Sequence, residues 1–370
     1  MNRKISVCHL TSPHPRYDTR IFHKECISLA KIGYDITLVV ADGNKNEKLE
    51  GVNIVGIEKP KNKLERLYKT TKKIYQKAIE LNADIYHFHD PELIYVGLKL
   101  IKKGKKVIYD IHEDLPRQLF VQKNKLIKRK IMEFFLERFE NYGAKRFTAL
   151  FTSTPYIKNR FIKINTNTEN INNFPILNEL LSKDEVRKNG NEICYVGSIV
   201  KIRGIFEMVR AIDSLDVKLN VCGDFASEDL KEEVSSLTSW EKVNYLGFVG
   251  RDKVREVMNE SVAGLVTLLP HPNFIKSYPV KMFEYMAASL PVIASDFPLF
   301  KEIIEGNDCG ICVNASNPDE IANAIKYIMD NPEEAKKMGE NGRRAVIEKY
   351  NWEKEVEKLS KVYANIIKDE

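Results

Sequence analysis

The chain has 370 residues, 43% of them hydrophobic and 30% charged, an ordinary globular balance that allows two domains with full cores. It contains no apolar run of about 18 residues and no signal-peptide pattern, so we expect a cytoplasmic protein that does not cross a membrane. The 6 cysteines are scattered and lie mostly in strand-like runs, which argues against a disulfide scaffold and indicates a reducing compartment.

Charge is distributed unevenly along the chain. Residues 1–175 carry 33 Lys and Arg against 19 Asp and Glu, a net charge of +14, whereas the remainder carries 25 against 33, a net charge of −8. Such asymmetry has two readings. The first part either meets an anionic partner, such as phosphate groups, lipid head groups or nucleic acid, or only has a lysine-rich, solvated surface.

The order of apolar runs predicts two successive β/α domains, 1–175 and 176–349, followed by a C-terminal helix in 350–370. In the first domain, strands are expected at 5–10, 36–40, 51–57, 84–89, 106–112 and 147–152, with helices at 19–32, 62–81 and 124–141. The asparagine-rich stretch 165–173 is expected to be the linker. In the second domain, strands are expected at 192–196, 218–222, 243–246, 263–268, 292–294 and 310–313.

Polar side chains follow two predicted strands of the first domain. His89-Asp90 and His112-Glu113 each end a strand, and the carboxyl ends of neighbouring parallel strands face the same crevice. The loop after the first strand adds further ionisable residues: Arg16, Asp18 and Arg20. The histidine spacing matches no zinc pattern and the chain has no Asp-x-Asp, so no metal is expected.

A glycine-bounded turn, Gly197 to Gly204, lies between a predicted strand and a helix that begins near Ile205. Such a turn aims backbone N–H groups and a helix end at an anion, and Arg203 adds a guanidinium suited to phosphate. By itself this pattern is a weak signal, because it is neither a P-loop nor a G-x-G-x-x-G sequence.

The stretch 277–296 indicates a loop, a short helix, a turn and a buried strand. Pro279 suits the first turn of the helix, Pro291 is expected to end it, and the apolar run from Val292 forms the strand. Glu284 is then a carboxylate on a helix near the carboxyl edge of a parallel sheet, where ligands bind.

This stretch resembles the nucleotide-sugar-binding signature of retaining GT-B glycosyltransferases, specifically family 4. The resemblance implies two Rossmann-like, doubly wound α/β domains facing a cleft, with the C-terminal helix crossing back to the first domain. In the family, the Glu matching Glu284 holds the donor ribose, and the His matching His89 lies at the reaction centre. The chain departs from the family pattern at Lys276, where a second Glu is usual, and at Ser198, where an Arg is usual.

The resemblance implies transfer of a sugar from a nucleoside diphosphate, with UDP expected, to a hydroxyl acceptor with retention, without metal or cofactor. The residues implied in catalysis are His89, Arg203 and Lys281. The implied donor contacts are Gly197, Ser198, Arg203, Ser277, Tyr278, Pro279, Val280, Lys281 and Glu284. The implied acceptor contacts are Arg16, Asp18, Arg20, Asp90, His112 and Glu113. No second carboxylate is placed as a nucleophile, so front-face transfer is expected.

The basic helices at 62–81 and 124–141 suggest that the first domain lies peripherally on the anionic inner face of the plasma membrane and takes a lipid-linked or surface-polysaccharide precursor there. The basic residues in the second helix are Lys125, Lys128, Arg129 and Lys130. Two alternatives remain open: a nucleotide-sugar epimerase of the same architecture, and a non-enzymatic basic adaptor for membrane or nucleic acid. No RNA-binding or helix-turn-helix signature supports nucleic acid as a partner.

Overall fold

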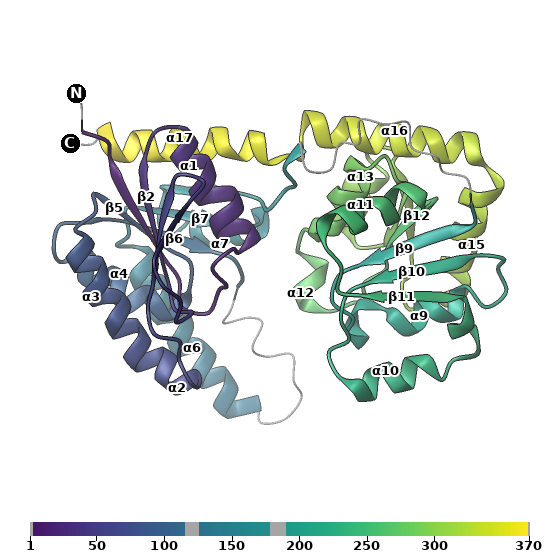
Figure 1. Cartoon of the computed structure of the whole chain (residues 1–370), viewed down its shortest axis with the longest axis horizontal. Helices are drawn as coiled ribbons and strands as arrows, with labels where there is room; N and C mark the ends of the chain where they lie inside the picture. Colours follow the sequence, from purple (N-terminus) through teal and green to yellow (C-terminus); the bar gives the residue numbers. More distant parts are fainter. Residues whose placement is uncertain (1–2, 115–125, 178–189, 369–370) are drawn as a thin grey trace. The chain divides into compact units, whose positions relative to one another are not determined.

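The computed structural model describes residues 3–114, 126–177 and 190–368, apart from the side chains of 126–129 and 273. The chain divides into two compact units (Figure 1). Unit 1 consists of Met1–Asn173 with Glu355–Glu370, and unit 2 of Phe174–Lys354. Each unit is a largely parallel sheet with helices on both faces, which is the doubly wound architecture that the sequence predicts.

The sheet of unit 1 has the strand order β3-β4-β2-β1-β5-β6-β7-β8, and only β3 is antiparallel to its neighbour. The strands are β1 (Ser6–Leu10), β2 (Asp35–Val40), β3 (Glu47–Leu49), β4 (Val52–Gly56), β5 (Ile85–Phe88), β6 (Lys106–Ile111), β7 (Ala149–Thr152) and β8 (Thr168–Asn170). The short strands β3 and β8 were not predicted. Because β8 pairs with β7, residues 168–170 of the predicted linker 165–173 belong to the sheet of unit 1, and the boundary between the units follows Asn173.

The helices of unit 1 are α1 (Ile27–Lys31), α2 (Lys63–Glu65), α3 (Thr71–Leu81), α4 (Ile94–Ile101), α6 (Leu126–Ala144), α7 (Pro155–Phe161) and most of α17 (Trp352–Lys368). Wide, π-type turns at Thr19–Cys26 and Arg66–Thr70 interrupt two of the predicted helices. Leu64 and Tyr68, in the predicted helix 62–81, are 69% and 74% exposed.

Side chains of the unit 1 strands alternate between two faces. Cys8 and Tyr86 belong to the core beneath α3 and α4. His9 and His87, which are register partners across β1 and β5, therefore point to the other face. There His87 contacts Tyr363 of α17, so the C-terminal helix helps to cover this face.

The sheet of unit 2 has the strand order β11-β10-β9-β12-β13-β14, all parallel. Its strands are β9 (Glu192–Val196), β10 (Lys218–Cys222), β11 (Val243–Gly247), β12 (Ala263–Val266), β13 (Val292–Ser295) and β14 (Gly310–Val313). Its helices are α9 (Ile205–Ala211), α10 (Glu228–Ser235), α11 (Arg251–Glu260), α12 (Pro272–Ile275), α13 (Val280–Ala287), α14 (Pro298–Ile304), α15 (Pro318–Asp330) and α16 (Pro332–Glu348). The chain reverses direction across the sheet between β9 and β12, and such a switch point is where doubly wound sheets bind ligands.

Helix α13 is fixed against this switch point by Tyr285. The hydroxyl of Tyr285 accepts a hydrogen bond from the N–H of Val196 at 2.8 Å, and its ring lies where a Cβ on Gly264 would be, with 2.4 Å to the nearest ring atom. The helix ends at Ala287, with Ser289 in the left-handed region at a φ of 54°. The expectation that Pro291 ends it is wrong, because the chain turns before the proline.

Candidate functional site

The turn after β9 has the geometry of an anion site. The chain turns at Gly197 with a φ of 131°, passes through a short 3-10 turn at Lys201–Arg203 and enters α9 after Gly204, which has a φ of 77°. A Cβ on Gly204 would meet the carbonyl oxygen of Thr267 at 2.1 Å, so only glycine fits. No side chain caps α9, which leaves its first N–H groups for a ligand or water.

A lysine amine is buried beside this turn. The Nζ of Lys281 lies 2.9 Å from the position that a Cβ on Gly197 would take, and 3.6 Å from the ring centre of Tyr195. Lys281 is partly exposed as a residue, but its Nζ is buried and has no hydrogen-bond partner. Burial, together with the charge of Arg203, lowers the pKa of Lys281 well below its usual value.

The guanidinium of Arg203 lies over the same turn. Its Nη1 donates to the hydroxyl of Ser198 at 2.7 Å and to the backbone carbonyl of Ser198 at 3.1 Å. Four predicted residues, Gly197, Ser198, Arg203 and Lys281, are therefore brought together around one turn. The serine that replaces the family's usual arginine serves here as an anchor for Arg203.

Glu284 lies one helical turn after Lys281 on α13 and is only 8% exposed. Its Oε1 accepts a hydrogen bond from Nη1 of Arg251 at 2.7 Å. Arg251 is the first residue of α11, and its side chain is 55% exposed. The sequence analysis missed Arg251, because no motif marks it.

The remaining predicted donor contacts are Ser277, Tyr278, Pro279 and Val280. Ser277 and Pro279 lead into α13, whose first turn has no side-chain cap. The ring of Tyr278 instead packs in the core of unit 2, 5.7 Å from the ring of Phe174 and 5.8 Å from that of Phe283. This segment therefore offers backbone groups at a helix end rather than a free phenol ring.

In unit 1, the ends of β5 and β6 share a buried polar cluster. The side chain of His89 is fully buried, and its Nδ1 lies 3.3 Å from Oδ2 of Asp110 and 3.3 Å from Nε2 of His112. His112 Nε2 lies 2.8 Å from the same Asp110 oxygen, and its side chain is 20% exposed. The strand ends thus meet as predicted. The carboxylate that joins them is Asp110, whereas Glu113 is exposed.

Arg20 holds Asp110 from the opposite side. Its Nε and Nη2 donate to the two carboxylate oxygens at 2.9 Å each, and its Nε lies 3.1 Å from Glu25. Burial alone would raise the pKa of Asp110, but Arg20 and His112 bring it well below its usual range. Burial and the charge of Asp110 raise the pKa of Glu25 well above its usual range. Arg20 therefore acts inside the unit and is 5% exposed, which leaves it little surface for an acceptor.

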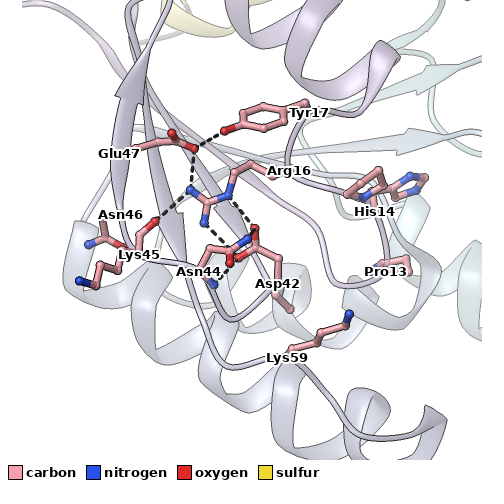
Figure 2. A pocket seen from close by; sticks show the side chains of 12 residues that line it. Pro13, His14, Arg16, Tyr17, Asp42, Asn44, Lys45, Asn46, Glu47 and Lys59 are labelled. Carbon is pink, nitrogen blue, oxygen red and sulfur yellow. Dashed lines mark hydrogen bonds and ion pairs between the residues drawn. The ribbon is translucent and has the colours of Figure 1, made fainter. Parts of the chain in front are cut away.

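Arg16 is also paired within unit 1. Figure 2 shows its guanidinium between Asp42 and Glu47, with Nε donating to Asp42 at 2.6 Å and Nη1 to Glu47 at 2.7 Å. It lines a pocket of about 820 Å³ together with residues such as His14 and Lys59. Arg16 thus shapes the wall of this pocket.

His14 is a further ionisable residue beside the predicted ones. Its ring lies 3.4 Å from Asp18 and 3.3 Å from Asp90, and 5.4 Å from the ring of His112. Burial opposes its protonation, but the bonds to Asp18 and Asp90 prevail and raise the pKa of His14 to about 10. The sequence analysis did not select His14, although its place in the proline-rich loop after β1 was a signal.

Two groups of described residues place potential metal-ligating atoms within 4.8 Å of one another: His9, Glu25, His87 and His89, and His89, Asp110 and His112. Their members come from three strands and a helical turn, so no local spacing reveals them. No helix in the described part of the chain is long and apolar enough to span a membrane.

Comparison with known families gives two adjacent matches. The model described as Glycosyl transferases group 1 matches residues 178–345, and the model described as Glycosyltransferase Family 4 matches residues 20–173. An uncharacterised glycosyltransferase of Methanocaldococcus jannaschii is 25% identical over 62% of each chain. The N-acetyl-alpha-D-glucosaminyl L-malate synthase of Bacillus anthracis is 21% identical over 80% of this chain and 79% of its own. The matches to the first three curated relatives span only 45% to 62% of their lengths.

Solved structures share the fold over the whole chain. Sucrose-phosphate synthase from Thermosynechococcus elongatus has a TM-score of 0.80 at 16% identity, covering 99% of this chain and 100% of its own. Anabaena HepE, solved in complex with UDP-glucose, has a TM-score of 0.74 at 16% identity, covering 98% and 100%. With both halves matched by the family models, the chain belongs to the GT-B glycosyltransferases of the family 4 type.

Proposed function

We propose that the protein transfers a sugar from a nucleoside diphosphate sugar, with UDP as the expected nucleotide, to a hydroxyl acceptor with retention. The observation that carries the proposal is the buried Nζ of Lys281, which lies over the ring of Tyr195 and against the glycine turn after β9 but has no hydrogen-bond partner. An anion placed there would pair with this amine, with Arg203 and with the free N–H groups of α9. A diphosphate has two adjacent negative groups and can therefore contact both cations and the N–H groups at once.

Helix α13 also supplies the proposed contact to the donor ribose, Glu284. Glu284 is buried but close enough to the surface for Arg251 to reach it, so a ribose hydroxyl could donate to its second oxygen. Positive charge for the leaving diphosphate would come from Lys281 and Arg203, so this step requires no metal.

Retention follows from a front-face step. The bond between the anomeric carbon and the diphosphate oxygen breaks, and the acceptor oxygen bonds to the same face of that carbon. The acceptor proton passes to the departing phosphate. No enzyme carboxylate is needed as a nucleophile, and the proposed diphosphate contacts Gly197, Ser198, Arg203 and Lys281 are cationic or neutral.

We assign acceptor binding to unit 1, around His14 and His112. These imidazoles are partly exposed, and the buried carboxylates Asp90 and Asp110 hold them in place. His89 is fully buried, so its role would be to position Asp110 and His112 rather than to touch the sugar.

For the acceptor, we propose a lipid-linked or surface-polysaccharide precursor met at an anionic membrane surface. Helix α6 exposes Phe134 and Phe135 by 54% and 65%, beside the cations Arg138 and Arg146. Exposed aromatic residues among cations suit the head-group layer of a membrane. Lys125 and the side chains of Lys128 and Arg129, which motivated the membrane prediction, lie outside the described residues.

A panel of nucleoside diphosphates and nucleotide sugars, tested by calorimetry and thermal shift, examines the donor assignment. One nucleotide should bind and raise the melting temperature, since it stabilises only the folded state. Donor should then be consumed only when acceptor is present, and the product should keep the anomeric configuration by NMR. Absence of binding by every nucleotide would refute the proposed function.

A further inference from the structure

Unit 1 contains a set of buried polar atoms that the proposed transfer does not use. The side chains of His87 and Glu25 have no exposed surface, and His9 is fully buried. Nε2 of His87 and Oε2 of Glu25 are buried without a hydrogen-bond partner, whereas Oε1 of Glu25 forms an ion pair with Nε of Arg20 at 3.1 Å. Because nearly all buried polar atoms in proteins are paired, these two in one place call for a ligand.

The fold brings these residues together from separate elements. His9 and His87 face each other across β1 and β5, and His89 lies two residues further along, on the same face of the sheet. Glu25 comes from the π-type turn Thr19–Cys26 that covers this face. Such wide turns are rare and are often found at functional sites.

The distances suit the ligands of one metal ion. His9 Nδ1 lies 3.0 Å from His89 Nε2, and Glu25 Oε2 lies 3.9 Å from His87 Nε2 and 4.0 Å from His89 Nε2. In a tetrahedral zinc site with bonds of about 2.0 to 2.1 Å, two ligand atoms are about 3.3 Å apart. The distance between His9 and His89 is shorter than this value, and the two distances from Glu25 are longer.

The outward nitrogens of two histidines are already held. His87 Nδ1 lies 2.8 Å from the hydroxyl of Tyr363, and His89 Nδ1 lies 3.3 Å from the carboxylate of Asp110. Metal-ligating histidines typically donate their second N–H to a carboxylate or another acceptor, which leaves the other nitrogen as a lone pair for the metal. Here both Nε2 atoms face Glu25.

Charge also favours a cation. Glu25 and Asp110 are both buried carboxylates, and in the described residues they share the guanidinium of Arg20. If both carboxylates are ionised, one buried negative charge is uncompensated, and burying such a charge is costly. A metal ion would remove this imbalance. The metal-free alternative is a protonated Glu25 with an N–H···N bond between His9 and His89.

We propose that His9, His87, His89 and Glu25 bind a zinc ion inside unit 1. Three imidazoles and one carboxylate complete a tetrahedral shell with no position open to substrate, so the ion would be structural. It would tie β1 and β5 to the turn Thr19–Cys26. It would also fix the ring of His89, whose Nδ1 faces Asp110. This site is separate from the proposed donor diphosphate site in unit 2, for which we propose no metal.

Elemental analysis of the full chain, purified without a histidine tag or added metal, tests the proposal. About one equivalent of zinc is expected, and its removal by a strong chelator should lower the melting temperature, with recovery on adding zinc back. Cobalt(II) added to the stripped protein should give the visible absorption of a tetrahedral site. His87→Gln should abolish this absorption. His23→Gln, a change at an exposed histidine on the same turn as Glu25, should retain it.

Less than a tenth of an equivalent of any first-row divalent metal, with no cobalt absorption and no response of the melting temperature to zinc, would overturn the proposal. The cluster would then be the proton-sharing network described above. If His87→Gln fails to fold, Glu25→Gln provides the second variant, since it removes only the carboxylate charge and keeps the side-chain volume. These readouts do not depend on transferase activity, so they stand even if the proposed donor or acceptor is wrong.

Discussion

Replacing Lys281 with Met should weaken nucleotide binding and stabilise the free protein at the same time. A charge-assisted hydrogen bond is worth about 1.5 to 3 kcal/mol, so loss of the Lys281 contact to the diphosphate should raise Kd about 10- to 150-fold. Without nucleotide, the Nζ is buried over the ring of Tyr195 without a hydrogen-bond partner, and an unsatisfied polar group costs about 1 to 3 kcal/mol. Met keeps the length of the side chain without this polar group, and each kcal/mol gained should raise Tm by about 2 to 4 °C.

The pH dependence of the wild-type protein follows from the same lysine. Its pKa in the folded protein is well below the value of 10.5 in an unfolded chain, so the unfolded state binds more protons between these two pKa values. Stability should therefore rise with pH in this window, relative to Lys281→Met. A diphosphate favours the charged amine, so nucleotide binding in this window should take up a proton and weaken as pH rises.

Calorimetry in buffers of different ionisation enthalpy measures this proton uptake, and thermal melting measures the stability. The control is Lys201→Met, because Lys201 lies two residues from Arg203 but is 58% exposed and pairs with Glu233. It should change neither proton uptake nor Tm appreciably. If Lys281→Met binds nucleotide as tightly as the wild type, or melts at a lower temperature, the assignment of Lys281 as a diphosphate ligand is refuted.

Glu284→Gln should weaken donor binding by roughly 1 to 3 kcal/mol, because a charge-assisted bond to ribose becomes neutral; equal donor affinity by calorimetry would contradict the assignment. Transfer should survive brief exposure to EDTA, since Arg203 and Lys281 supply the charge at the diphosphate; loss of activity that manganese or magnesium restores would show otherwise. His112→Ala should lower kcat about 100-fold or more with little change in donor Kd, because His112 lies in unit 1; unchanged kcat would remove it from the reaction centre. Replacing Phe134 and Phe135 with Ser should reduce sedimentation with anionic vesicles at low salt and leave donor binding intact; wild-type protein that never sediments would refute the membrane proposal.

Local sequence patterns were sufficient to predict most of the strands and turns of the fold. The predicted parallel strands are present, because strands covered on both faces read as short apolar runs between turns. The Gly197 to Gly204 turn and α13 lie where their glycines and Pro279 indicate, since positive φ and the missing proline N–H are local constraints. The sequence analysis did not predict the edge strands. Strand β8, for example, is short and polar, and only its pairing with β7 makes it a strand.

The residues of the candidate sites were harder to predict from sequence than the fold, because their partners are set by tertiary contacts. Glu284 could be chosen from its own segment, but its partner Arg251 begins another helix 33 residues away. His89 and His112 were chosen because both end strands, whereas Asp110 was overlooked because an acidic residue inside a strand looks like part of the strand. Only the register of β5 and β6 and the reach of Arg20 make Asp110 the shared carboxylate.

The sequence by itself determined the two β/α domains, the glycine turn and the carboxylate on α13, because backbone conformation, hydrophobic period and helix ends are set by neighbouring residues. Tertiary structure decided which ionisable groups lose water and which partners they find. Lys281 is an ordinary lysine in the sequence, and burial of its Nζ beside Gly197 gives it a lowered pKa. His9, Glu25 and His87 became a candidate metal site only when β1, β5 and the turn Thr19–Cys26 packed together, since desolvation and long-range proximity are properties of the folded chain.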